Sequence, residues 1–314
     1  NKALKHLEKA FEISREVRDR EGEAVALGNI GSVYQHKSEP DKALTYSERS
    51  LKICQELKNQ RGEAVNLGNI GLIHRTKGRF TEALKYHQQA LKIHRKIKDR
   101  EGEADQLGNI GMIYQIKGEP DKALKYLEEA MRIHRDINDR EGESNELCAI
   151  GLIYKTKGEL TKAIKYMEDA LKIAQKIGDR LGEAINLGNI GLIYEIRGET
   201  IKAVEHYEQA LRICQDVGNR EGVASQLGHM GRIYKVKGKL DKALIYSEQS
   251  LKIYSGMESH KGKADQLCNI GLIYLTKFEF DKAFQHLQES LKISREIEYP
   301  LGEANSLYGT GLVY

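Results

Sequence analysis

Apolar and small residues along this chain follow the spacing of successive amphipathic helices. Leu27, Ile30, Gly31 and Tyr34 fall at i, i+3, i+4 and i+7, which places them on one face of a helix. A second run with helical spacing starts at Ala43, a few residues further on. Polar residues and turn formers separate the two runs. The pattern therefore predicts a pair of helices joined by a short turn.

This helix pair recurs along the chain with a period of 40 residues. Residues at the same place in successive repeats are called a column here, and each column is named after one member. The Gly22 column comprises Gly22, Gly62, Gly102, Gly142, Gly182, Gly222, Gly262 and Gly302, and the Gly31 column comprises Gly31, Gly71, Gly111, Gly151, Gly191, Gly231, Gly271 and Gly311. A fixed period of this length predicts a stacked array, because one helix pair cannot bury its apolar face alone. We expect a single array over residues 1–314, with half repeats at 1–18 and 299–314 and full repeats at 19–58, 59–98, 99–138, 139–178, 179–218, 219–258 and 259–298.

Local signals place the helix ends within each repeat. Asp19 precedes the first helix and can accept a hydrogen bond from a backbone N–H that lacks a partner there. Pro40 suits the first position of the second helix, where its missing N–H costs nothing. Gly31 lies inside the first helix, where Gly costs about 1 kcal/mol relative to Ala. Its strict recurrence indicates close packing of the first helix on the second, with the small Ala43 opposite.

The small-residue pattern of Gly31, Tyr34, Ala43 and Ser50 resembles the tetratricopeptide repeat. The 40-residue unit is similar to the long repeats of kinesin light chain and of the Leu-Gly-Asn (Pins-type) scaffolds. The letters Leu-Gly-Asn at 27–29 stand out of register with the second group, and the run at 69–73 looks closer to kinesin light chain. The resemblance implies an all-α fold, a right-handed superhelical α-solenoid of helix-turn-helix repeats with about sixteen helices.

The resemblance also implies that the first helices line a concave groove. The Asn29 column would offer amides to a peptide backbone, the Leu72 column an apolar floor, and the Arg75 column a variable charge. The Gly28 column would let a ligand backbone approach closely. The candidate peptide-binding residues are Asn29, Asn69, Asn109, Asn189, Asn269, His229, Leu72, Leu152, Leu192, Arg75, Lys155, Arg232 and Lys235.

Each of these columns also has a structural interpretation. The Asn29 column would then bond the backbone of a neighbouring helix, and the Gly28 column would only permit tight stacking. Leu72 and its equivalents would be core, and the cations of the Arg75 column would form an ordinary solvated face. The pattern alone leaves these alternatives open.

One repeat interrupts two columns together. His229 and Arg232 replace the usual residues, and Lys235 follows one turn later. These three residues make a local basic spot on an otherwise apolar wall, which suits an acidic side chain of a partner. The alternative is neutral sequence drift.

Composition argues against several other functions. The chain is 40% hydrophobic and 31% charged, and it contains no apolar run near the ~20 residues that a membrane span needs. Its net charge of +4 gives little support for a nucleic-acid partner. The glycines are periodic and form neither a phosphate-cradling loop nor a nucleophile elbow. We therefore expect a protein that is not an enzyme and that uses no cofactor or metal.

Cysteine and histidine patterns agree with that expectation. The four cysteines fall into two columns, and the two members of each column lie three or four repeats apart, too far for a disulfide; they are Cys54, Cys148, Cys214 and Cys268. Free thiols favour a reducing compartment, the cytoplasm. His94 and His134 share a column one repeat apart, and without a third ligand we expect them to be surface residues.

We therefore expect a protein–protein interaction scaffold that binds an extended peptide or partner segment in the groove. The alternative is the ligand-sensing array of a larger signalling or defence protein. A remote alternative is single-stranded nucleic-acid binding, which would need aromatic stacking platforms among basic residues. Since the chain does not begin with Met, we expect a part of a longer protein.

The two half repeats predict a self-association as well. Residues 1–18 read as a second helix and residues 299–314 as a first helix, and both carry apolar residues. Docking of 299–314 of one molecule on 1–18 of the next would complete a repeat. Such a heterologous contact propagates into rings or filaments.

Overall fold

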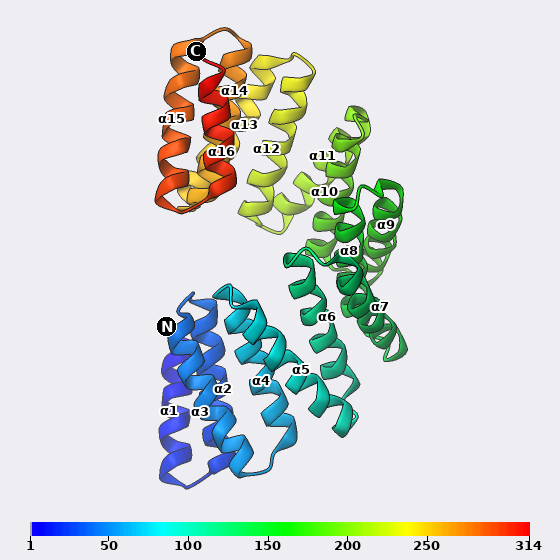
Figure 1. Ribbon diagram of the computed structural model, residues 1–314, viewed down its shortest axis with the longest axis vertical. Helices are drawn as coiled ribbons and strands as arrows, with labels where there is room; N and C mark the ends of the chain where they lie inside the picture. The colour runs from blue at the N-terminus through cyan, green and yellow to red at the C-terminus, as the bar shows by residue number, and fades with distance from the viewer. Residues whose placement is uncertain (1) are drawn as a thin grey trace. The chain divides into compact units, whose positions relative to one another are not determined.

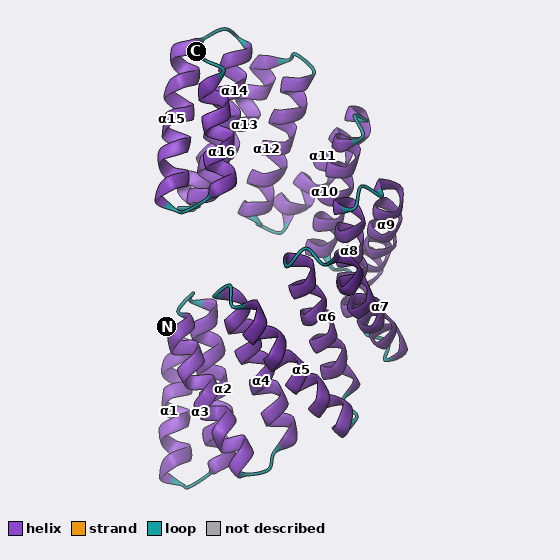
Figure 2. Ribbon diagram, viewed as in Figure 1, coloured by secondary structure: helices purple, strands orange, loops and turns teal. Residues whose placement is uncertain are grey.

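The computed structural model describes residues 2–314, which form helices joined by short turns (Figures 1 and 2). The chain makes two compact units, residues 1–159 and 160–314. The first unit contains α1 (Lys2–Glu16), α2 (Arg20–His36), α3 (Pro40–Glu56), α4 (Gln60–Thr76), α5 (Phe80–Ile97), α6 (Arg100–Ile116), α7 (Pro120–Asp136) and α8 (Arg140–Thr156). The second contains α9 (Leu160–Ile177), α10 (Arg180–Ile196), α11 (Thr200–Asp216), α12 (Arg220–Val236), α13 (Leu240–Gly256), α14 (His260–Thr276), α15 (Phe280–Glu296) and α16 (Pro300–Gly311).

The predicted all-α solenoid class is confirmed, with sixteen helices and no strand over residues 2–314. Even-numbered helices are the first helices of repeats, and odd-numbered helices are the second helices. Within each unit, consecutive helices pack side by side as antiparallel neighbours (Figure 1). The single array over 1–314 stays a prediction. No helix among the described residues is both long and apolar enough to cross a bilayer.

The helix ends follow the local signals. The backbone N–H of Gly22 donates to Asp19 Oδ1 at 2.9 Å, which confirms the predicted N-cap of α2. Pro40 opens α3 as expected. The turn between the helices of a repeat needs one residue in the left-handed region, and Gly78 adopts it with φ of 71°. Phe278 holds the same place with φ of 60°, an unusual conformation for a bulky residue.

The Gly31 column makes the contact between the two helices of one repeat. A Cβ at Gly71 would lie 2.7 Å from the His87 ring, and one at Gly111 would lie 2.7 Å from Leu127 Cγ. A buried side chain of the second helix fills the same space in each described pair: Ser47, His87, Leu127, Tyr207, Ser247 and Leu287. The glycines therefore admit a side chain from the second helix, which offsets their cost of about 1 kcal/mol.

The Gly22 column makes a different contact, with the second helix of the preceding repeat. A Cβ at Gly62 would lie 2.7 Å from Cys54 Sγ, for example. The equivalents of Cys54 include His94 and His134, and both are buried. The expectation that these histidines lie on the surface is therefore wrong, because the glycine opposite each ring leaves room for it. Their Nδ1 atoms contact Asp99 Oδ2 at 3.1 Å and Asp139 Oδ2 at 2.7 Å.

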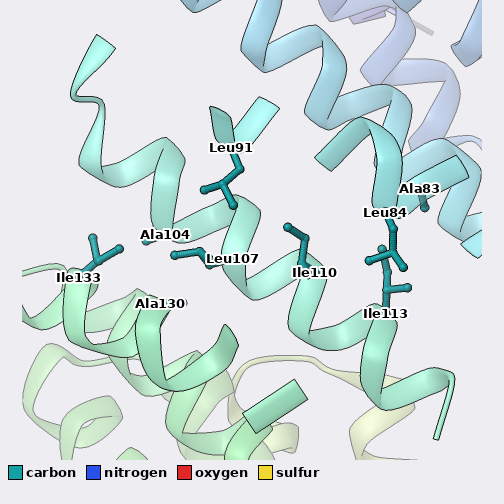
Figure 3. Packing of buried hydrophobic residues seen from close by; sticks show 9 residues of the cluster. All are labelled: Ala83, Leu84, Leu91, Ala104, Leu107, Ile110, Ile113, Ala130 and Ile133. Atoms are coloured by element: carbon teal, nitrogen blue, oxygen red, sulfur yellow. The ribbon is translucent and has the colours of Figure 1, made fainter. Parts of the chain in front are cut away.

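The hydrophobic core runs between neighbouring pairs in the same unit. Figure 3 shows side chains of α6 pointing towards α5 on one side and α7 on the other. Leu107, Ile110 and Ile113 of α6 are fully buried, and burial of each such side chain contributes about 1.5–3 kcal/mol. The cluster comprises Ala83, Leu84, Leu91, Ala104, Leu107, Ile110, Ile113, Ala130 and Ile133.

We expect Gly111→Val to lower the midpoint of thermal unfolding, because the new side chain would meet Leu127 and the carbonyl oxygen of Ala123, 3.3 Å from a Cβ. Overpacking of this kind costs about 1–3 kcal/mol. The matched control is Gly311→Val, since a Cβ at Gly311 meets nothing within 4 Å. At low protein concentration the control should melt like the unmodified chain. Equal melting of both variants would show that the glycine column is not a packing device.

Candidate functional site

Two cavities along the first helices of the first unit form one depression. One, of about 400 Å³, lies over α2 and α4, and the next, of about 330 Å³, lies over α4 and α6. They share Arg61, Val65 and Asn69, so the depression continues from one repeat to the next. We call it the first-unit groove. Of the predicted site residues, Asn29, Asn69, Asn109 and Leu72 line it.

The amides of the Asn29 column differ in their bonding. Asn109 Nδ2 donates to the carbonyl oxygen of Asp105 at 2.9 Å, and its Oδ1 accepts from Arg75 Nη1 at 3.4 Å. Asn29 and Asn69 make no side-chain hydrogen bond within residues 2–314, and Asn29 is exposed. The backbone acceptor of Asn109 lies in its own helix α6, not in a neighbouring helix as the structural interpretation requires. Asn29 and Asn69 present both donor and acceptor to the groove. In the second unit Asn269 lines a cavity, and Asn189 is half-buried.

The Gly28 column serves helix stacking, which was the alternative interpretation. A Cβ at Gly68 would lie 3.1 Å from the amide of Gln106 on the next first helix, and one at Gly228 would lie 2.6 Å from Gln266. Gly68 and Gly228 are themselves buried. Gly28 differs, because it is half-buried and lines the first-unit groove.

Glu146 differs from its equivalents among the side chains that pack against the Gly28 column. Asn or Gln stands at this place in most repeats, whereas here a carboxyl packs against Gly108. Burial raises the pKa of Glu146 to about 8, and the nearby Asp105 adds to the rise. A carboxyl with this pKa is largely protonated at neutral pH, and the protonated acid can replace the amide as a neutral group.

The three cations of the Arg75 column are half-buried, so they do not form an ordinary solvated face. Burial lowers the pKa of Arg75, Lys155 and Lys235. Lys155 and Lys235 make no hydrogen bond or ion pair within the described part of the chain. Arg75 also lines a wider cavity of about 800 Å³ with Met112. Leu152 and Leu192 are half-buried on the same helix face.

The basic spot at His229, Arg232 and Lys235 differs from the prediction, because Arg232 already has an anionic partner. Its Nε donates to Glu195 Oε1 at 3.2 Å, and the hydroxyl of Tyr207 donates to Glu195 Oε2 at 2.6 Å. Burial would raise the pKa of Glu195, but the hydrogen bond with His229, the charge of Arg232 and the Tyr207 hydroxyl hold it at about 2. Within residues 2–314, no carboxylate forms an ion pair with Lys235, in contrast to Arg232.

These residues line one cavity of the second unit. It has a volume of about 520 Å³ over α12, α14 and α16 and is lined by His229, Arg232, Lys235, Asp265 and Asn269, among others. We call it the second-unit groove. The His229 ring stacks on Tyr207, with centroids 4.8 Å apart. No group of three or more potential metal ligands occurs within residues 2–314.

Sequence reasoning missed the roles of Glu195 and Tyr207. Tyr207 belongs to the buried column that fills the space at the Gly31 column, and it reaches Glu195 beside Gly191. The spacing of 37 residues could have indicated the contact between Glu195 and Arg232. Met112 lies at the same spacing after Arg75, and the two residues of each pair are in contact.

Comparison with known families identifies the class of protein. A family description for the tetratricopeptide repeat matches residues 1–56, 62–136, 144–216 and 222–296, which is more than half of the chain. The chain therefore belongs to the tetratricopeptide-repeat family. A comparison with proteins of curated function found no significant match.

Solved structures show the same fold at low sequence identity. The apo form of RapI is 13% identical with a TM-score of 0.71, over 88% of this chain and 99% of that one. A signal transduction ATPase with numerous domains and a tetratricopeptide repeat sensor, from Pyrococcus horikoshii, is 19% identical with a TM-score of 0.71, over 98% of this chain and 48% of that one. Nearly identical repeats of a putative kinesin light chain from Podosopora anserina are 16% identical with a TM-score of 0.51, over 61% of this chain and 95% of that one.

We expect Glu146→Gln to change the pH dependence of stability. The folded state keeps the Glu146 proton up to a pKa of about 8, whereas the unfolded chain loses it near the ordinary value of 4.5. The unmodified chain should therefore lose stability relative to the variant as pH rises through this window, by at most about 1.4 kcal/mol per pH unit. Unfolding midpoints from pH 5 to about pH 9 measure the difference. A difference that does not vary with pH would contradict the raised pKa.

Proposed function

We propose that this protein is a non-enzymatic interaction scaffold that binds an extended segment of a partner protein along its first helices. The observation that carries the proposal is the first-unit groove, in which the unbonded amides of Asn29 and Asn69 lie in successive repeats. An extended peptide presents an N–H and a C=O at every residue. A side-chain amide can accept from one and donate to the other.

A lysine of the second-unit groove, Lys235, favours a partner with acidic side chains there, and Lys155 holds the equivalent place on α8. Lys155 and Lys235 are half-buried and have no carboxylate partner within residues 2–314. A carboxylate placed beside such a lysine would recover interactions that the ammonium lost on burial. A charge-assisted hydrogen bond contributes about 1.5–3 kcal/mol, more than a bond between neutral groups.

The sensor array of a larger signalling protein is the second candidate. It is favoured by the likeness to the Pyrococcus horikoshii ATPase, whose sensor carries tetratricopeptide repeats and of which this chain spans just under half.

Nucleic-acid binding has less support, because the rings of the Tyr34 column stack within the repeat, as Tyr34 does on Tyr46 with ring centroids 5.4 Å apart. The buried free thiols of Cys54, Cys214 and Cys268 agree with a cytoplasmic location.

Photo-crosslinking tests the groove directly. A photoreactive residue at position 69 should crosslink to a partner from a cell lysate, and residues at 29 and 109 should label successive parts of one partner segment. The matched control places the same residue at 92, an exposed position on the second helix α5. Replacing Asn29 and Asn69 together with Ala should then abolish capture without changing the melting temperature. Crosslinks from position 92 alone would contradict binding in the groove.

The acidic nature of the partner has its own test. We expect Lys235→Glu to weaken binding of the mapped partner segment by about 1–3 kcal/mol, measured by isothermal titration calorimetry. Lys237→Glu makes the same charge change at an exposed position of the same helix end and is the matched control. Arg232 is unsuitable for this purpose, because its reversal would place a second acid beside Glu195. An equal effect of both variants would indicate only a general electrostatic attraction.

A further inference from the structure

Two groups of opposite charge line the second-unit groove without pairing with each other. Lys235 of α12 and Asp265 of α14 both line its cavity of about 520 Å³, and both are half-buried. In the described part of the chain neither forms an ion pair, and the nearby Arg232 is paired with Glu195. The cavity therefore holds one cation and one anion that each lack a charged partner.

The carboxylate of Asp265 has room for another hydrogen-bond donor. The hydroxyl of Tyr299 donates one hydrogen bond to it, and a carboxylate can accept about four. Burial raises the pKa of Asp265, because this bond and the nearby charges of Lys261 and Arg232 offset only part of the lost hydration. An ammonium group beside the carboxylate would favour its charged form.

The first unit contains an equivalent cation that shows how far such a side chain reaches. Arg75 stands in the same column as Lys235, four repeats earlier. Its Nη1 atom lies 3.4 Å from Asn109 Oδ1 and 3.8 Å from Met112 Sδ. These two residues follow Asp105 by four and seven positions on the next first helix.

The same relation in the second unit gives the separation of the two charges. Asp265 is the equivalent of Asp105, so the Lys235 ammonium lies four to seven residues further along α14, about 6–10 Å at 1.5 Å per residue. The ammonium nitrogen and a carboxylate oxygen of an α-amino acid are about 3 Å apart, because both groups are bonded to one carbon. With a hydrogen bond of about 2.8 Å at each end, such a ligand spans about 8–9 Å.

The first unit differs from the second at the corresponding places. Asp105 lines the first-unit groove, whereas Arg75 lines another cavity, and the Arg75 guanidinium bonds to Asn109. In the second unit the cation and the carboxylate line one cavity, and Asn269 makes no side-chain hydrogen bond within residues 2–314. The arrangement that could hold both ends of a ligand is therefore that of the second unit.

We infer that the second-unit groove binds a free α-amino acid, whose carboxylate lies beside Lys235 and whose ammonium lies beside Asp265. The amide of Asn269, one turn after Asp265, can donate to the carboxylate or accept from the ammonium. Leu272 and Leu301 line the same cavity and favour an apolar side chain such as that of leucine. The cavity of about 520 Å³ lies within the range of small-molecule sites.

This inference goes beyond the binding of a protein partner, and it concerns the second unit alone. The amino acid and an acidic side chain of a partner would compete for Lys235. The test uses the purified chain without any partner, whereas the scaffold proposal is tested by capture at position 69 of the first unit. Failure of one is therefore distinguishable from failure of the other.

Analogues that lack one charge test the chemistry on the unmodified chain. The twenty common amino acids are titrated by isothermal titration calorimetry, and we expect leucine to bind. N-acetylleucine lacks the ammonium and leucinamide lacks the carboxylate, so each loses a charge-assisted hydrogen bond and should bind at least about tenfold more weakly. Absence of binding by every amino acid at millimolar concentration, or equal binding of leucine and both analogues, would overturn the inference.

Two variants test the assigned residues. Asp265→Asn should weaken leucine at least about tenfold but leave N-acetylleucine unchanged, because that analogue has no ammonium for Asp265. Lys235→Gln should likewise weaken leucine but not leucinamide. The matched controls Asp281→Asn and Lys237→Gln make the same changes at exposed positions and should bind leucine like the unmodified chain. Circular dichroism checks that each variant folds, and equal effects of site and control variants would contradict the assignment.

Discussion

The missing Cβ atoms on the first helices are the constraint on which the rest of this structure depends. Each of three glycine columns admits a different neighbour: the preceding second helix at Gly22, the next first helix at Gly28, and the helix's own partner at Gly31. A Cβ would meet the neighbouring helix at 2.7 Å at Gly22 and at Gly31 but only at 3.4 Å at Gly28, a place that Cys148 and Cys268 fill with a side chain. Because three sides of a first helix are engaged in this way, the columns of Asn29, Leu72 and Arg75 are left to vary at the groove.

Close packing also connects the core to the chemistry of the groove. The column that fills the space at Gly31 contains polar residues in some repeats, and these reach past the first helix. Tyr207 donates to Glu195, and Glu195 in turn holds Arg232. His87 Nδ1 lies 2.8 Å from Gln106 Oε1, an atom of the amide that covers Gly68. A substitution in the core of one repeat can therefore alter the charge that its groove presents.

Most of the fold follows from periodicity, because helical spacing and a 40-residue repeat depend only on positions along the chain. The N-cap at Asp19 and the packing role of Gly31 were predictable for the same reason. Burial of His94 was not, since it depends on the glycine of the following repeat that faces the ring. Neutralisation of Arg232 depends on Glu195, 37 residues earlier and one repeat away. Reasoning within one repeat cannot detect such pairs, and the binding role of the first helices stays a prediction.

The half-buried charges distinguish the parts of the grooves that are complete from those that a partner would complete. Arg232 has lost water but gained Glu195, and a paired charge of this kind has little to gain from a ligand. Lys235 has lost water and gained no carboxylate, so its pKa falls. Binding of an acidic ligand would reverse that fall, because a nearby anion favours the protonated form of lysine. Affinity at this site should therefore be coupled to proton uptake wherever the free lysine is partly deprotonated, a linkage that an uncharged ligand would not produce.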